Sequence, residues 1–170
     1  MAVLTEEQSM LRDAARSWVQ EKSPVTAFRR MRDSGVELGY DAAAWNEMAE
    51  MGWAGVIIPE EYGGSNFGYL SLGLVLEELG RTLTASPLIA SGLGAASALI
   101  LGGSDAQKTE WLPKIADGSA VAALAVDEGP HHRPEKVEAT VSGGKLTGKK
   151  VFVLEGMAAN LFVVSAKEGG

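Results

Sequence analysis

Cysteine is absent from all 170 residues of the sequence. Its absence excludes disulfide bonds, thiolate zinc sites and a cysteine nucleophile, and it leaves the redox compartment open. Histidine is nearly as scarce, because His131 and His132 are the only two. Adjacent histidines rarely point toward one metal ion, and no third histidine is present to complete a closed site. We therefore expect no metal centre and place both histidines in a surface loop.

Basic residues are also relatively few. The 15 lysines and arginines are outnumbered by 22 acidic residues, which gives a net charge of −7 at pH 7. The basic residues are scattered along the chain rather than gathered into a stripe. A phosphate-binding surface for nucleic acid needs such a stripe, so we expect no nucleic-acid partner.

Long apolar runs are lacking as well. The longest, residues 88–101, contains two glycines and is shorter than the roughly 20 residues of a membrane-spanning helix. The first residues are acidic and do not have the basic and then apolar order of a secretory signal. We expect no membrane span and a cytoplasmic location.

Helix-start signals recur through the first two thirds of the chain. Thr5 and Gln8 have the spacing of a capping box, as do Ser104 and Gln107, and Asp41 precedes an amphipathic stretch. Six helices are predicted, from 5 to about 21, 24 to 35, 41 to 51, 69 to 83, 87 to 102, and 104 past 115. The fifth is apolar on nearly all sides, which predicts a central position.

Beyond residue 120 the pattern changes to extended segments, predicted at 120–126, 136–141, 145–154 and 161–165. The sequence Ser142-Gly143-Gly144-Lys145 supplies the flexible pair of a tight hairpin. Helices followed by strands indicate the α+β class. We expect an all-helical domain over residues 1–118 and antiparallel strands over residues 119–170. The β part looks incomplete, because its last apolar strand needs further polypeptide or another subunit to cover it.

Two groups of residues invite a chemical interpretation that the spacing does not favour. Gly92, Gly94, Ala95 and Ala96 look superficially like a dinucleotide-binding glycine motif, but they sit inside a helical run. Small residues there favour close approach of a neighbouring helix or of a ligand. Glu77 stands four residues before Arg81, the spacing of an ordinary ion pair on a helix surface. We therefore nominate no catalytic residue.

The most distinctive segment is 52–64. Gly52 follows a helix that it can end, residues 56–58 form a short apolar run, and Pro59 and the glycine pair 63–64 turn the chain. Together with residues 73–81, this segment strongly resembles the amino-terminal helical domain of the acyl-CoA dehydrogenase family. The resemblance extends over nearly the whole chain, as six helices followed by the opening strands of the middle β-domain.

The resemblance implies a flavoenzyme that uses FAD to desaturate the Cα–Cβ bond of an acyl-CoA thioester. It also implies an electron-transfer flavoprotein or similar acceptor and a homo- or hetero-oligomer. The catalytic base of the family comes from a carboxy-terminal domain, so the resemblance assigns none to this chain. The flavin-contacting residues that it implies are Leu124, Val126, Asp127, Phe152, Val153 and Leu154. The acyl group would lie against Gly92, Gly94, Ala95 and Ala96, whose small size predicts room for a branched or steroid-like group.

The chain departs from the family pattern at three places. Asp127 replaces a threonine, Leu154 replaces a residue that offers a hydroxyl to the flavin, and residues 130–132 replace a Gly-Ser pair. Two hypotheses remain open from the sequence: an active flavoenzyme with altered contacts, or a partner subunit that does not bind flavin, as in the bacterial steroid-type heteromeric members. A non-catalytic interaction module is the competing class.

Overall fold

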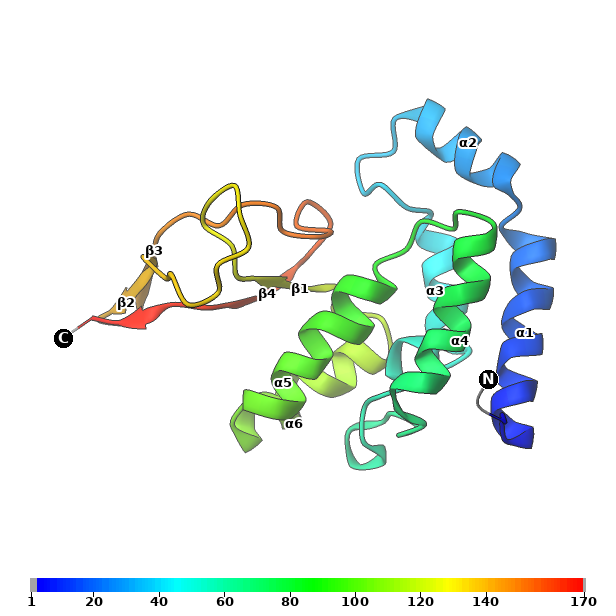
Figure 1. Ribbon diagram of the computed structural model, residues 1–170, viewed down its shortest axis with the longest axis horizontal. Helices are drawn as coiled ribbons and strands as arrows, with labels where there is room; N and C mark the ends of the chain where they lie inside the picture. Colours follow the sequence, from blue (N-terminus) through cyan, green and yellow to red (C-terminus); the bar gives the residue numbers. More distant parts are fainter. Residues whose placement is uncertain (1–2, 170) are drawn as a thin grey trace.

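The computed structural model describes residues 3–169, with a helical part and an elongated β part that extends away from it (Figure 1). The helices are α1 (Glu6–Lys22), α2 (Val25–Ser34), α3 (Ala42–Glu50), η1 (Trp53–Gly55), η2 (Glu60–Tyr62), α4 (Gly68–Arg81), η3 (Leu88–Ala95), α5 (Ala96–Gly102) and α6 (Asp105–Ala116). Each of the six predicted helices is present with small differences at its ends. None of these helices, within residues 3–169, is both long and apolar enough to cross a membrane.

The predicted helix starts form as local hydrogen-bonded caps. Both capping boxes are complete, one between Thr5 and Gln8 and the other between Ser104 and Gln107. The Asp41 carboxylate accepts hydrogen bonds from the first backbone N–H groups of α3. Each such cap is worth about 1 kcal/mol, so local sequence alone fixes where these three helices begin.

The segment 52–64 passes through the interior, as its apolar run predicts. Trp53 packs edge-on against Trp18 of α1, with 5.5 Å between ring centroids and 81° between ring planes. Residues 56–58 are buried. A side chain at Gly64 would overlap the carbonyl oxygen of Ile58, so the returning chain requires glycine there. This segment is therefore the centre around which the helices pack.

A buried carboxylate joins α1 to α4. Glu78 is 1% exposed, and it accepts two hydrogen bonds from the Arg16 guanidinium, at 2.8 and 3.3 Å. Arg81 lies 3.3 Å from the same carboxylate. The hydrogen bond from Arg16 lowers the pKa of Glu78 below its ordinary value. The predicted surface pair between Glu77 and Arg81 is also present, at 2.7 Å.

The predicted fifth helix consists of two segments with different winding. Its first half, η3, is a π-helix, and its second half, α5, is a regular α-helix. Ile89 and Leu101 are exposed, so one side of this apolar helix faces solvent and the predicted central position is only partly correct. π-Helical segments are rare, and they frequently occur at functional sites.

η3 is bound directly to the first strand, β1 (Ala122–Ala125). Ser91 is fully buried, and its hydroxyl accepts a hydrogen bond from the N–H of Ala122 at 3.0 Å. The same hydroxyl donates to the carbonyl of Ala120 at 3.4 Å. The Ser91 side chain thus fixes the position of β1 against the helical part.

Two small sheets make up the β part. The remaining strands are β2 (Thr140–Ser142), β3 (Lys145–Thr147), β4 (Leu161–Val164) and β5 (Lys167–Glu168). β1 pairs with β4 in parallel, while β2 pairs with β3 antiparallel and with β5 in parallel. The α+β class is confirmed, although only the β2–β3 pair is antiparallel as predicted. Its turn is the predicted one, because Gly143 and Gly144 adopt φ of +56° and +73°.

Two predicted strands are shorter than expected. The segment 136–141 forms a strand only from Thr140, because the Glu128 carboxylate binds the preceding N–H groups of Glu138 and Ala139. The segment 145–154 forms a strand only to Thr147.

The later part of segment 145–154 leaves the extended conformation for two reasons. The N–H of Val151 donates to the carbonyl of Asp127, which lies beyond the end of β1 and outside any ladder. Phe152 then takes a φ of +53°, a left-handed conformation that an extended strand does not contain. The chain therefore turns at the residues that the sequence assigned to flavin contact.

Ser91→Ala tests how strongly the helical part holds β1. The substitution leaves the buried N–H of Ala122 without its partner, so we expect a loss of about 1–3 kcal/mol in the free energy of unfolding. Ser97→Ala is the matched control, because that hydroxyl bonds Tyr69 at an exposed position and should cost less than about 0.5 kcal/mol. Urea denaturation of both variants measures the difference, and equal losses would contradict the role of Ser91.

Candidate functional site

The two segments that the sequence assigns to flavin contact meet at the end of β1. The N–H of Val151 donates to the carbonyl of Asp127 at 2.8 Å. The Lys150 ammonium donates to the carbonyl of Val126 at 3.1 Å. Segments 124–127 and 150–154 are distant in sequence, so these two bonds bring them together.

A partly buried ion pair holds this junction. The Lys150 ammonium donates to Glu128 at 2.6 Å and to the Ser165 hydroxyl, which follows β4, at 2.9 Å. The Glu128 carboxylate also accepts the N–H groups of Glu138, at 2.6 Å, and Ala139, at 3.0 Å. Lys150 is 9% exposed and Glu128 11%. We refer to these five residues as the Glu128–Lys150 cluster.

The cluster stabilises the charged form of Glu128. Its hydrogen bond from Lys150, assisted by the N–H groups of Ala139 and Glu138, lowers the pKa of Glu128 from 4.5 to about 2 despite the opposing effect of burial. The sequence analysis assigned neither Glu128 nor Lys150 to the site. The signal that could have found them is that residues 124–128 end in two acidic side chains, whereas residues 150–154 begin with a lysine.

The predicted flavin residues differ in their exposure. Leu124, Phe152 and Leu154 are exposed apolar side chains, with Phe152 79% accessible. Val126, Asp127 and Val153 are half-buried. Val153 lines a cavity of about 280 Å³ whose wall is mainly apolar. The structure thus places a mainly apolar cavity, lined in part by Ala139 and Lys150, at the Glu128–Lys150 cluster.

The Asp127 carboxylate is directed toward the histidine loop. Its two oxygens lie 2.9 and 3.2 Å from Nδ1 of His132. His131 points elsewhere and lines a separate cavity. Among residues 3–169, no three His, Cys, Asp or Glu side chains are grouped so that they could hold a metal ion. The two histidines lie in an exposed loop, as predicted.

The four predicted acyl-pocket residues have two different environments. Ala95 and Ala96 are fully buried in the core. A Cβ at Gly92 would lie 3.2 Å from the Ala54 carbonyl oxygen, so this glycine permits close packing against the segment 52–64. These three residues shape the helix packing rather than an open surface.

Gly94 differs, because it is half-buried and faces the strand. A Cβ there would lie 4.0 Å from Cβ of Leu124 and 3.5 Å from the Ile89 carbonyl oxygen. One predicted acyl residue and one predicted flavin residue therefore lie side by side, where η3 contacts β1.

Glu128→Gln tests the cluster through its pH dependence. A pKa lowered in the folded state stabilises the protein fully above about pH 4.5, and this stabilisation is lost as pH falls toward about 2. We expect the variant to melt several degrees lower near neutral pH and to show a smaller loss of melting temperature on acidification. Circular dichroism melts across that pH range measure both effects.

The control for Glu128→Gln is Glu135→Gln. Glu135 is exposed and makes no hydrogen bond or ion pair within the described residues 3–169, yet its substitution removes the same charge. An identical melting profile for the two variants would show that the cluster does not stabilise the fold.

Comparison with known proteins supplies the family of the chain. Residues 5–119 match the family described as "Acyl-CoA dehydrogenase, N-terminal domain". The chain is 33% identical over 174 aligned residues to the mitochondrial isovaleryl-CoA dehydrogenase of Pongo abelii, covering 96% of this chain and 40% of that protein.

Solved structures give the same result. The ChsE4-ChsE5 complex from Mycobacterium tuberculosis matches with a TM-score of 0.84 and 28% identity, over 99% of this chain and 46% of that one. A variant of the Tcur3481-Tcur3483 steroid ACAD matches with a TM-score of 0.84 and 30% identity, over 96% of this chain and 45% of that one. The chain thus spans less than half the length of these relatives. On the match of residues 5–119, the chain belongs to the acyl-CoA dehydrogenase family.

Proposed function

We propose that this chain is part of a FAD-dependent acyl-CoA dehydrogenase, which desaturates the Cα–Cβ bond of an acyl-CoA thioester. The observation that carries the proposal is the meeting of segments 124–127 and 150–154 through the bonds of Lys150 and Val151. In this proposal residues 1–118 form the helical domain and residues 119–170 begin the middle β-domain. An electron-transfer flavoprotein or similar acceptor and an oligomeric assembly belong to the same proposal.

In this proposal, residues at the junction would contact the flavin ring. Leu124, Phe152 and Leu154 expose apolar side chains, and exposed apolar surface of this kind commonly marks a binding site. Val126, Asp127 and Val153 complete the set that would hold FAD. When bound, FAD would supply the hydride acceptor, since the redox chemistry belongs to the cofactor.

The chain's own residues hold the two flavin segments in position and bind the Asp127 carboxylate. The Glu128–Lys150 cluster holds both segments in register. Nδ1 of His132 lies 2.9 Å from the Asp127 carboxylate, so this carboxylate is engaged by the histidine loop. Such preorganised electrostatics matter wherever negative charge develops during a reaction.

In this proposal, Glu78 is not the base that removes the α-proton. Glu78 is the one buried carboxylate among residues 3–169, and Arg16 and Arg81 already bind it. A general base must reach the proton that it abstracts, and Glu78 serves instead to join two helices.

The environment of Gly94 supports a wide acyl group as substrate. A Cβ at this half-buried position would lie in ordinary van der Waals contact with Leu124 and the Ile89 carbonyl oxygen, so its absence leaves a small additional space where η3 contacts β1. A branched or steroid-like acyl group needs more width than a straight chain. The similarity to a steroid ACAD agrees with this part of the proposal.

A second candidate function is a partner subunit that does not itself bind flavin. Two observations favour it. Asp127 puts a carboxylate in the flavin segment, and segment 150–154 contains no hydroxyl. The Ser165 hydroxyl accepts a hydrogen bond from Lys150, the first residue of that segment, at 2.9 Å. A non-catalytic interaction module is the remaining alternative.

A flavin absorption spectrum of the purified chain separates these functions. The proposed flavoenzyme predicts bound flavin, with absorbance near 450 nm, after the chain is mixed with FAD and passed through a desalting column. Flavin retained only when a neighbouring dehydrogenase subunit is added would support the partner-subunit function. Flavin retained under neither condition would contradict both and leave the interaction module.

Gly94→Leu tests the acyl pocket. The added side chain would fill the space beside Leu124, so we expect kcat/KM for a steroid-derived CoA ester to fall at least about tenfold, with a smaller loss for butyryl-CoA. Gly73→Leu is the control, because Gly73 is an exposed helical glycine with no atom within 4 Å of an added Cβ. Equal losses for both esters would argue against a pocket at Gly94. Activity is measured in the assembled enzyme.

A further inference from the structure

The charge of Asp127 is matched by a histidine from the loop that follows it. Asp127 lies directly after β1 in the sequence, at two residues from its end, and its side chain is 23% exposed. Nδ1 of His132 lies 2.9 and 3.2 Å from the two carboxylate oxygens. Within the described residues 3–169, no other basic side chain forms an ion pair with this carboxylate. The net charge at Asp127 therefore depends on whether His132 is protonated.

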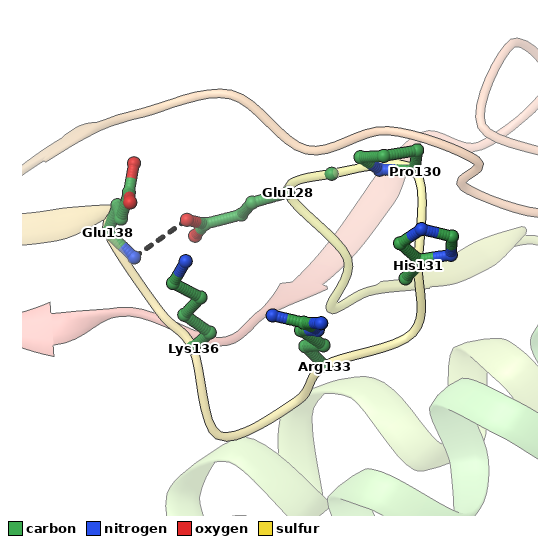
Figure 2. Close-up of a pocket in the computed structure, with 7 residues that line it drawn as sticks. Glu128, Pro130, His131, Arg133, Lys136 and Glu138 are labelled. Carbon is green, nitrogen blue, oxygen red and sulfur yellow. Dashed lines mark hydrogen bonds between the residues drawn. The ribbon is translucent and has the colours of Figure 1, made fainter.

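The elements around Asp127 contribute no other charge that is left unbalanced. η3 and β4 pack against β1, and neither contains a charged residue. Glu128 follows Asp127, and the Lys150 ammonium neutralises it at 2.6 Å. The other ionisable residues of the loop line a separate cavity or are exposed: His131, Arg133, Glu135, Lys136 and Glu138 (Figure 2). His132 is thus the group that can change the charge beside Asp127.

The backbone that carries His132 is restrained. Figure 2 shows the loop leaving Glu128 and returning to it, because the Glu128 carboxylate accepts the N–H groups of residues 138–139. Pro130 and Pro134 lie on either side of His132, and each fixes its own φ. The side chain of His132 is nevertheless 70% exposed. It can therefore exchange a proton with solvent while the loop keeps its position.

Protonation of His132 changes the charge of the pair without breaking its contact. A carboxylate only accepts hydrogen bonds, so Nδ1 must carry a proton to donate one. Nδ1 is protonated in the charged ring and also in one of the two neutral tautomers. Histidine is the side chain whose charge ordinarily changes between about pH 5 and 8. The pair is therefore neutral overall at the acidic end of that range and negative at the alkaline end.

We propose that His132 makes the stability of the reduced flavin depend on pH, and that it acts through Asp127. The inference rests on the proposed function, in which Asp127 belongs to the set of residues that hold FAD. Reduction adds negative charge to the flavin, which a neighbouring carboxylate opposes. The protonated ring of His132 neutralises that carboxylate and so favours the reduced form. His132 is accordingly a positioning residue that links the redox balance of the site to pH.

Reductive titration of bound flavin against a reference dye tests the proposal, in the form that retains FAD, either the chain alone or the chain with its partner subunit. The reduction potential gives the ratio of the affinities for reduced and oxidised flavin. At about pH 5.5, where histidine is ordinarily charged, we expect H132Q to lower this ratio at least about threefold. At about pH 8.5, where histidine is ordinarily neutral, H132Q and the unsubstituted protein should agree.

Two further variants separate this role from a structural one. H131Q removes the neighbouring histidine, which does not contact Asp127, and should behave like the unsubstituted protein at both pH values. The double variant D127N/H132Q should match D127N, because His132 then has no carboxylate to neutralise.

The possible failures are distinct. Retained flavin whose reduced-to-oxidised affinity ratio is unchanged by H132Q, or is lowered equally at both pH values, would overturn the role of His132 alone. An effect of H132Q that persists in the D127N background would contradict action through Asp127. Failure of every form to retain flavin would contradict the proposed function and this inference with it.

Discussion

The ion pair between Glu128 and Lys150 is the interaction on which the β part depends. Short strands of two to four residues give few ladder hydrogen bonds, so the sheets alone hold this region weakly. The ion pair joins the end of β1 to the segment after β3 and, through Ser165, to the end of β4. Its carboxylate also closes the loop 128–138. The proposed flavin segments therefore depend on this one electrostatic support.

The helical part determines where this support lies. The segment 52–64 forms the centre of the helix packing, and Gly92 lets η3 approach it closely. Ser91 of η3 then binds the backbone on either side of the start of β1. A continuous set of contacts thus leads from the helix core to β1 and the residues that follow it. The position of Gly94 beside Leu124 is a consequence of that packing.

Local patterns predicted the parts of the fold that local interactions determine. The capping residues Thr5 and Ser104 marked helix starts correctly, because a cap involves only residues three positions apart. The lengths of the strands were not predictable in this way. Side chains of Glu128 and Lys150 capture backbone groups 10 to 24 residues away, and they replace the ladder that the alternating pattern of residues 136–141 suggested. The closure of the loop at residues 128–138 depends on the same long-range bonds.

The most direct test of this account is hydrogen exchange of a Lys150→Met variant, compared residue by residue with the unsubstituted chain. If the ion pair organises the region, the amides of Glu138, Ala139 and Val151 lose protection. The amides of α1 and α4, which are joined by their own buried carboxylate, keep theirs. Unchanged protection at those three β-part amides would contradict the account, because the region would then hold its shape without the Glu128–Lys150 pair.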